Sequence, residues 1–225
     1  METKLKWKNP AVFLTVMLLI VSNSNWLAKQ GIESLFEFGA YFVMFSSVFF
    51  SFLCSKCSQK TLIGTIVTFI VVSVLFCAGI AVQGLSVFTR LKLMATMVAI
   101  SAVILAEGYI NSWDTLRAGA YGILCGTAVT TLISLVTGVS VMEMVHDGFM
   151  SYGFAGGVQY KNFFGAFMLG SFMSLYFYNR YHRKHLMDGI VMVLELVLIF
   201  LSSARGTYIF LVVFLIVVNC DRVWA

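Results

Sequence analysis

Long apolar runs separated by short polar segments are the feature that most constrains how this chain folds. Charged residues make up only 11% of the 225 residues, and most of them lie between the runs. Ordinary soluble domains carry roughly 25% charged residues, and a run of about 18 apolar residues is long enough to cross a bilayer as a helix. Pro10 is the single proline, which favours uninterrupted helices. The sequence therefore predicts an integral membrane protein.

The order of the runs predicts an all-α fold, a polytopic transmembrane helical bundle of about eight spans with no soluble domain. A single transmembrane domain fills residues 1–225, with an outer loop at 138–161. The expected spans are 10–27, 34–55, 61–84, 93–110, 118–137, 162–178, 186–202 and 207–219. Basic residues gather in the segments that this path places inside, so the positive-inside rule predicts a cytoplasmic N-terminus. The net charge of +5 follows from these loops, and nucleic-acid binding is not predicted.

Arg205 lies between the apolar runs 186–201 and 208–218. An ionisable group at a bilayer face is costly without a partner or a wet cavity, which makes Arg205 a functional candidate. Gly206 allows the backbone to turn or a ligand to approach closely, and Ser203 offers a hydroxyl to freed backbone groups or to a polar ligand. The alternative is a plain chain reversal whose arginine reaches the phosphate headgroups.

A second candidate segment runs from Gly156 to Gly165. It predicts a bend at the paired glycines, with Lys161 and Asn162 at the outer N-terminus of a helix and Asn162 as its N-cap. A helix N-terminus beside a lysine attracts phosphate. Tyr160 and its aromatic neighbours suit sugar stacking, and the alternative is a belt of aromatic residues at headgroup level.

Other polar residues leave alternatives open. His146 and Asp147 form either an acid/base pair or a solvated loop pair. Glu107 and Glu195 fall within predicted spans, where carboxylates often mark an ion path; Glu195 is alternatively protonated or bonded to a neighbouring helix. No P-loop and no metal-spaced His/Cys/Glu set occurs in the sequence, so we predict no cofactor and no metal.

Two motifs together resemble one family. They are the glycine-rich segment 156–165, which contains Lys161-Asn162, and Ser202-Ser203-Ala204-Arg205-Gly206, with two predicted spans between them. This pattern is similar to the O-antigen ligases and the capsular and O-antigen polysaccharide polymerases of bacterial envelopes. Ala204 departs from the residue usual before the arginine. The family also uses an arginine and a histidine on a later outer loop, so the resemblance implies that this chain is the N-terminal part of a longer, truncated protein.

The resemblance implies a glycosyltransferase of the bacterial cytoplasmic membrane. The expected activity is a repeat-unit polymerase that joins oligosaccharides carried on undecaprenyl diphosphate, by inverting, metal-independent transfer at the outer face, and that is inactive if the truncation removes part of its site. Arg205 would be catalytic, and Lys161, Asn162, Ser203, Gly206 and Tyr160 would bind substrate. The alternatives are an O-antigen ligase and, from another class, a lipid-linked oligosaccharide flippase or other multispan transporter. Membrane lipids and other polysaccharide-assembly proteins are the further expected partners.

Overall fold

The computed structural model describes residues 8–54, 67, 70, 71, 74, 112–146 and 150–223. Within them lie seven helices and one β-hairpin: α1 (Lys8–Ser22), α2 (Asn25–Gln30), α3 (Glu33–Cys54), α6 (Ser112–Thr137), β1 (Met142–His146), β2 (Met150–Phe154), α7 (Lys161–Tyr181), α8 (Leu186–Ser202) and α9 (Arg205–Val223). The predicted spans at 61–84 and 93–110 lie, apart from four isolated residues, outside the described part of the chain.

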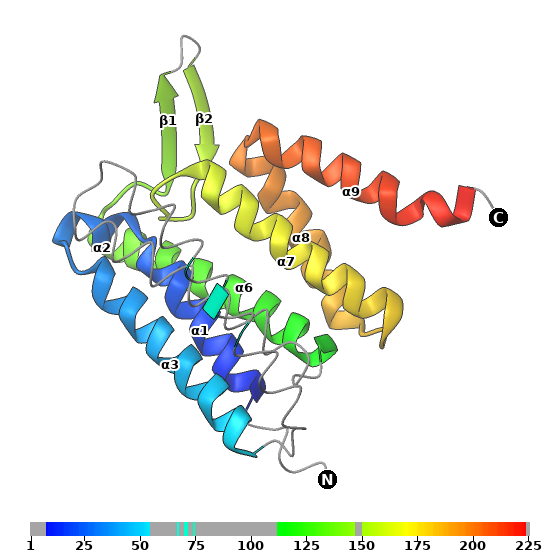
Figure 1. Cartoon of the computed structure of the whole chain (residues 1–225). Helices are drawn as coiled ribbons and strands as arrows, with labels where there is room; N and C mark the ends of the chain where they lie inside the picture. The colour runs from blue at the N-terminus through cyan, green and yellow to red at the C-terminus, as the bar shows by residue number, and fades with distance from the viewer. Residues whose placement is uncertain are drawn as a thin grey trace.

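The helices pack side by side in a continuous series (Figure 1). Helix α1 lies between α3 and α6, α7 packs on α6, and α8 packs on α7. Helix α9 begins close to the end of α8, contacts α7 and α8, and then extends away from the bundle. The hairpin projects from the end of the bundle at which α7 and α9 begin, so three chain segments meet there.

Helix α6 approaches α1 closely because small residues line the contact. A Cβ at Gly122 would lie 2.8 Å from the Phe13 carbonyl oxygen, and one at Gly126 would lie 2.7 Å from the Ile20 Cβ. Small residues let two helix backbones pack closely, a device common in membrane proteins.

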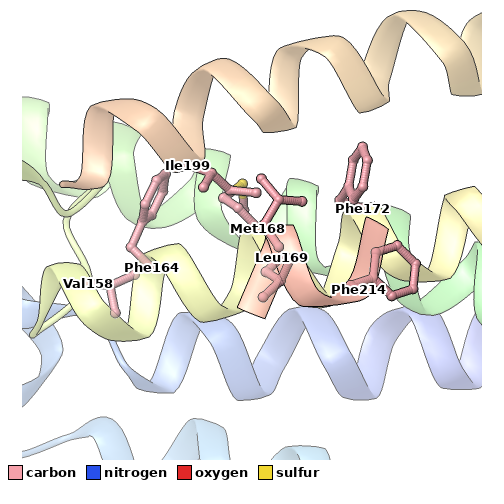
Figure 2. Close-up of a cluster of buried hydrophobic side chains, with 8 residues drawn as sticks. Val158, Phe164, Met168, Leu169, Phe172, Ile199 and Phe214 are labelled. Carbon is pink, nitrogen blue, oxygen red and sulfur yellow. The ribbon is translucent and has the colours of Figure 1, made fainter. Parts of the chain in front are cut away.

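The apolar core of the second half of the chain is built around α7 (Figure 2). Phe164, Met168 and Phe172 recur at helical spacing and form one buried stripe. Ile199 from α8 and Phe214 from α9 belong to the same cluster, with the Phe172 and Phe214 rings 6.4 Å apart edge to face. Helix α7 is therefore the element that joins α8 and α9 into one body.

The predicted eight-span, all-α bundle is wrong. Among the described residues, one helix, Trp113–Thr137, is long and apolar enough to cross a membrane, and the apolar stretches Pro10–Ser22 and Arg205–Cys220 are shorter. The hairpin β1–β2 also adds strands to an otherwise helical fold.

The reason is visible at the first predicted span, 10–27. Helix α1 ends at Ser22, where the Ser22 hydroxyl and the Asn23 side-chain amide each donate to the Leu19 carbonyl oxygen at 2.8 Å. The apolar stretch from Pro10 to Ser22 then spans only about 20 Å at 1.5 Å per residue, against about 30 Å of bilayer hydrocarbon. Hydropathy counts apolar residues along the chain but does not locate the polar turn that ends a helix.

The segment 138–161, predicted as an outer loop, contains the hairpin. Its strands are antiparallel, and their register pairs Met142 with Phe154 and Glu143 with Gly153. Within β1, Met142, Glu143 and Met144 alternate apolar, polar and apolar, a short strand signal that the loop prediction overlooked.

Candidate functional site at the junction of two motifs

The fold brings the two sequence motifs into direct contact. Gly165, on the first buried turn of α7, faces the connection between α8 and α9. A Cβ at Gly165 would lie 2.8 Å from the Ala204 Cβ, and 2.9 Å from both the Ser202 Oγ and the Thr207 Oγ1. Only glycine permits this approach, because any side chain would meet three atoms at once. Residues some 40 positions apart in sequence thus share one location, which we call the motif junction (Gly153, Lys161, Gly165 and residues 202–207).

The α8–α9 connection is a tight turn stabilised by its own side chains. Ser203 adopts a left-handed conformation with φ 52°, and the Ser202 hydroxyl donates to the Ile199 carbonyl at 2.6 Å and accepts from the Ala204 amide at 3.3 Å. The sequence suggested Gly206 for the turn, but Ser203 forms it. Gly206 lies inside the first turn of α9, where a Cβ would meet nothing within 4 Å.

Arg205 is the first residue of α9 and is exposed. Within the described residues, no hydrogen bond or ion pair engages its guanidinium. The Arg205 side chain is therefore exposed at the start of α9, beside the buried Ala204 and Thr207.

The glycine-rich loop is held by hydrogen bonds to helices α2 and α6. Gly156 and Gly157 both have positive φ, at 57° and 76°. The hydroxyl oxygens of Thr130 and Thr131 on α6 lie 2.8 and 3.0 Å from the Gly156 carbonyl oxygen, and both are also within hydrogen-bonding distance of the Thr127 carbonyl oxygen. The Asn25 backbone amide donates to the Gly157 carbonyl at 2.8 Å. The predicted bend at the two glycines is present, and it fixes the point at which α7 starts.

Lys161 begins α7 and is only 4% exposed. Its backbone amide donates to the Glu143 carboxylate, which reaches across from β1. Gly153 lies opposite Glu143 in the hairpin, and a Cβ there would collide with the Ser202 carbonyl oxygen and lie 2.6 Å from the Lys161 Cδ. The hairpin, α7 and the α8–α9 turn are therefore packed together at this lysine.

The N-terminus of α7 differs from the prediction. Its N-cap is Tyr160, which makes no side-chain capping bond, and Asn162 is the second helical residue and is exposed. The carboxylate of Glu143 takes the capping position, close to the positive end of the helix dipole. Sequence reasoning missed Glu143 because only the hairpin brings it to this helix.

The remaining candidate residues lie outside the motif junction or outside the described part of the chain. His146 is the last residue of β1 and pairs with Met150, whereas Asp147 and Glu107 lie outside the described residues. Within the described ranges, no group of three or more His, Cys, Asp or Glu residues is placed to hold a metal ion.

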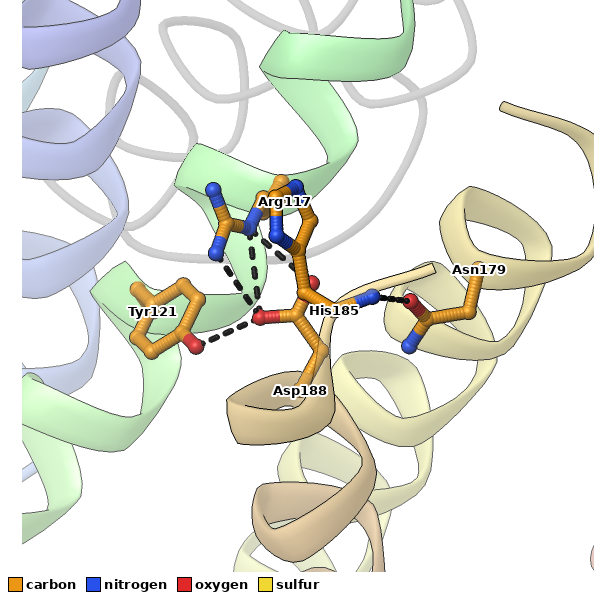
Figure 3. A network of polar contacts seen from close by, with 5 residues as sticks. All are labelled: Arg117, Tyr121, Asn179, His185 and Asp188. Atoms are coloured by element: carbon orange, nitrogen blue, oxygen red, sulfur yellow. Dashed lines mark hydrogen bonds and ion pairs between the residues drawn. The ribbon is translucent and has the colours of Figure 1, made fainter. Parts of the chain in front are cut away.

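A polar network holds the opposite end of the same helices (Figure 3). The fully buried Asp188 of α8 accepts from the Arg117 guanidinium at 3.0 and 3.2 Å and from the Tyr121 hydroxyl at 2.7 Å. Next to it, the His185 backbone amide donates to the Asn179 side-chain oxygen at 3.0 Å. This network joins α6 to α8 and shapes the turn after α7, so it has a structural explanation without a ligand.

Comparison of the chain with models of known protein families, with curated proteins and with solved structures finds no match.

Proposed function

We propose that this protein is a membrane glycosyltransferase that polymerises oligosaccharide repeat units carried on undecaprenyl diphosphate, for a capsule or O-antigen. The single observation in its support is the motif junction. Two motifs whose joint presence suggested this activity are in contact through Gly165, although two helices separate them in sequence. Helices α7 and α8 pack against each other and are joined by a short connection, which brings the start of α7 beside the end of α8.

In this proposal, Arg205 binds the donor diphosphate. A guanidinium offers a planar fork of N–H donors that matches phosphate oxygens, and Arg205 is exposed at the start of α9 with its charge unengaged by described residues. In the transfer, an acceptor hydroxyl attacks the anomeric carbon and releases its proton to solvent, the bond from that carbon to the diphosphate oxygen breaks, and the diphosphate leaves with the electron pair. Arg205 stabilises the charge that grows on the leaving group.

The other predicted substrate-binding residues differ in what they offer. Tyr160 and Asn162 are exposed beside the motif junction and suit sugar stacking and hydrogen bonding. Ser203 and Gly206 flank Arg205, and the open space at Gly206 leaves its backbone accessible to a ligand. Lys161 is buried, so we assign it an indirect contribution, through its charge below the surface.

The test is genetic complementation in the cells that carry this gene. Arg205→Ala and Arg205→Lys should each abolish polymer while the protein remains in the membrane, because lysine keeps the charge but loses the fork. Arg183→Ala is the matched control: Arg183 is also exposed, lies at the opposite end of α7 and α8, and should leave polymer unchanged. Normal polymer length with Arg205→Ala would refute the assignment.

The intermediates that accumulate separate polymerisation from the alternatives. Loss of a polymerase leaves single repeat units on their acceptor. Loss of a ligase leaves finished polymer on the lipid diphosphate, and loss of a flippase leaves the lipid-linked unit at the inner face. A binding assay with purified protein and undecaprenyl diphosphate should show weaker binding for Arg205→Ala than for Arg183→Ala.

A further inference from the structure

Two acidic residues are buried on one face of α8, and their surroundings are opposite in character. Asp188 and Glu195 lie two helical turns apart and are both 0% exposed. Asp188 is bound by a guanidinium and a phenol, as described above. Glu195 contacts one polar side chain, the Ser171 hydroxyl of α7, through its Oε1. Its Oε2 has no hydrogen-bond partner within the described part of the chain.

The Ser171 hydroxyl decides where the proton lies. Its Oγ is within hydrogen-bonding distance of the Glu195 Oε1 and lies 3.1 Å from the Ala120 carbonyl oxygen on α6. A serine hydroxyl has one proton to donate, and a carbonyl oxygen can only accept. Both contacts are hydrogen bonds only if Ser171 donates to Ala120 and Glu195 donates to Ser171, which requires a protonated Glu195.

The charged groups around Glu195 also indicate that its carboxyl group is protonated. A buried carboxylate persists only when cations or several donors surround it, and otherwise it takes up a proton. The helices and the strand that pack near α8 carry the following titratable or charged groups among the described residues whose side chains are placed: Asp114, Arg117, Tyr121 and Cys125 on α6; Tyr152 on β2; Lys161, Tyr176, Tyr178, Arg180 and Tyr181 on α7; Arg205, Tyr208 and Cys220 on α9. None of these makes a hydrogen bond or an ion pair with Glu195.

We propose that Glu195 is a proton-binding site that links three helices: it holds a proton in the folded protein and donates it to Ser171, whose hydroxyl donates to the Ala120 carbonyl. The site is distinct from the motif junction and does not depend on the proposed transferase activity. The unfolded chain releases this proton in mildly acidic solution, as free glutamate does. The folded state therefore binds more protons than the unfolded state, and stability through this group falls as the pH rises.

Infrared difference spectroscopy tests the proton directly. The folded protein at neutral pH should show the carbonyl stretch of a protonated carboxylic acid, shifted in heavy water, and Glu195→Gln should remove it. Asp188→Asn is the matched control, since Asp188 is buried on the same helix but paired with Arg117, and it should leave the band in place. Ser171→Ala should shift the band, because the carboxylic acid then loses its acceptor. Absence of the band, or its survival in Glu195→Gln, would overturn the proposal.

Unfolding as a function of pH tests the consequence. Glutamine reproduces the shape and the donor of the protonated acid, so Glu195→Gln should keep its unfolding midpoint as the pH rises above the mildly acidic range, where that of the wild type declines. If Glu195→Gln fails to fold, the band shift in Ser171→Ala still decides the assignment. A Glu195 contribution that strengthens as the pH rises would show an ionised carboxylate and overturn the proposal.

Discussion

At the scale of single residues, the candidate site depends on where side chains are missing. Gly165 lets α7 touch the α8–α9 turn, and Gly153 lets the hairpin lie against the Ser202 carbonyl and the Lys161 side chain. The atoms that face Gly165 belong to short side chains fixed close to the backbone, so they cannot move aside as the end of a long side chain can. Glycine at these positions is therefore a packing requirement.

Gly165→Ala should destabilise the protein by about 1–3 kcal/mol, because an extra methyl group forces apart elements that are already in contact. Gly170→Ala is the matched control on the same helix: a Cβ there meets nothing within 4 Å, and alanine should stabilise the helix by about 0.5–1 kcal/mol. Thermal unfolding of both variants in the same detergent measures the difference. Equal midpoints for the two variants would contradict close packing at Gly165.

At the scale of elements, α8 connects the two ends of the helical body. One end carries the turn that presents Arg205, and the other carries Asp188, which is bound by Arg117 and Tyr121 of α6. The side chain of Arg117 is 33% exposed, whereas that of Asp188 is fully buried. Removing the arginine therefore leaves a buried carboxylate without its cation, which costs more than losing a surface contact.

Arg117→Ala should cost about 3–5 kcal/mol of folding free energy, the usual penalty for a buried charge that loses its partner. Adding Asp188→Asn to this variant should recover part of the loss, because the unpaired charge is then gone. Chemical unfolding of the wild type, Arg117→Ala, Asp188→Asn and the double variant provides the cycle. A loss below about 0.5 kcal/mol for Arg117→Ala, typical of surface substitutions, would mean that the pair does not hold α6 to α8.

At the scale of the whole molecule, apolar side chains are exposed over long helical faces. On α8 the exposed residues recur at helical spacing, at Leu186, Met187, Ile190, Val193, Leu194 and Val197, and α9 carries a similar set from Ile209 to Val217. Soluble monomers rarely expose contiguous apolar patches of this extent. These faces support the proposal that the protein resides in a membrane, although the eight-span bundle is not what the described residues form.

Leu194→Lys should separate a lipid-facing α8 from a water-facing one. Leu194 is exposed near the middle of α8, where a lysine in hydrocarbon costs about 2.5–3.5 kcal/mol, but at a water-exposed surface a substitution changes stability by only about 0.5 kcal/mol. Leu186→Lys at the helix end should be tolerated, because its ammonium group can reach the interface. We expect less Leu194→Lys protein in alkali-washed membranes than Leu186→Lys, and equal amounts would argue against lipid contact at Leu194.

Helix positions were largely predictable, because apolar periodicity and polar breaks are local properties. Helix α8 has the bounds predicted for residues 186–202, and α3 agrees with its prediction to within one residue at each end. The start of α6 was harder, whereas its end at Thr137 was predicted: the helix starts at Ser112, six residues before the predicted start, and Arg117 within it is bound by Asp188 of α8. The local sequence pattern placed Arg117 in the loop before the predicted helix.

The sequence by itself determined the helical character, the bend at Gly156 and Gly157, and the two motifs, since each depends on neighbouring residues or on backbone conformation. Only the tertiary structure decided that the motifs touch, that Glu143 caps α7, and that Glu195 faces Ser171. These contacts join residues 18 positions apart at Glu143 and Lys161, 24 at Ser171 and Glu195, and 42 at Gly165 and Thr207. No local propensity encodes them, because the packing of whole helices and of the hairpin brings them together.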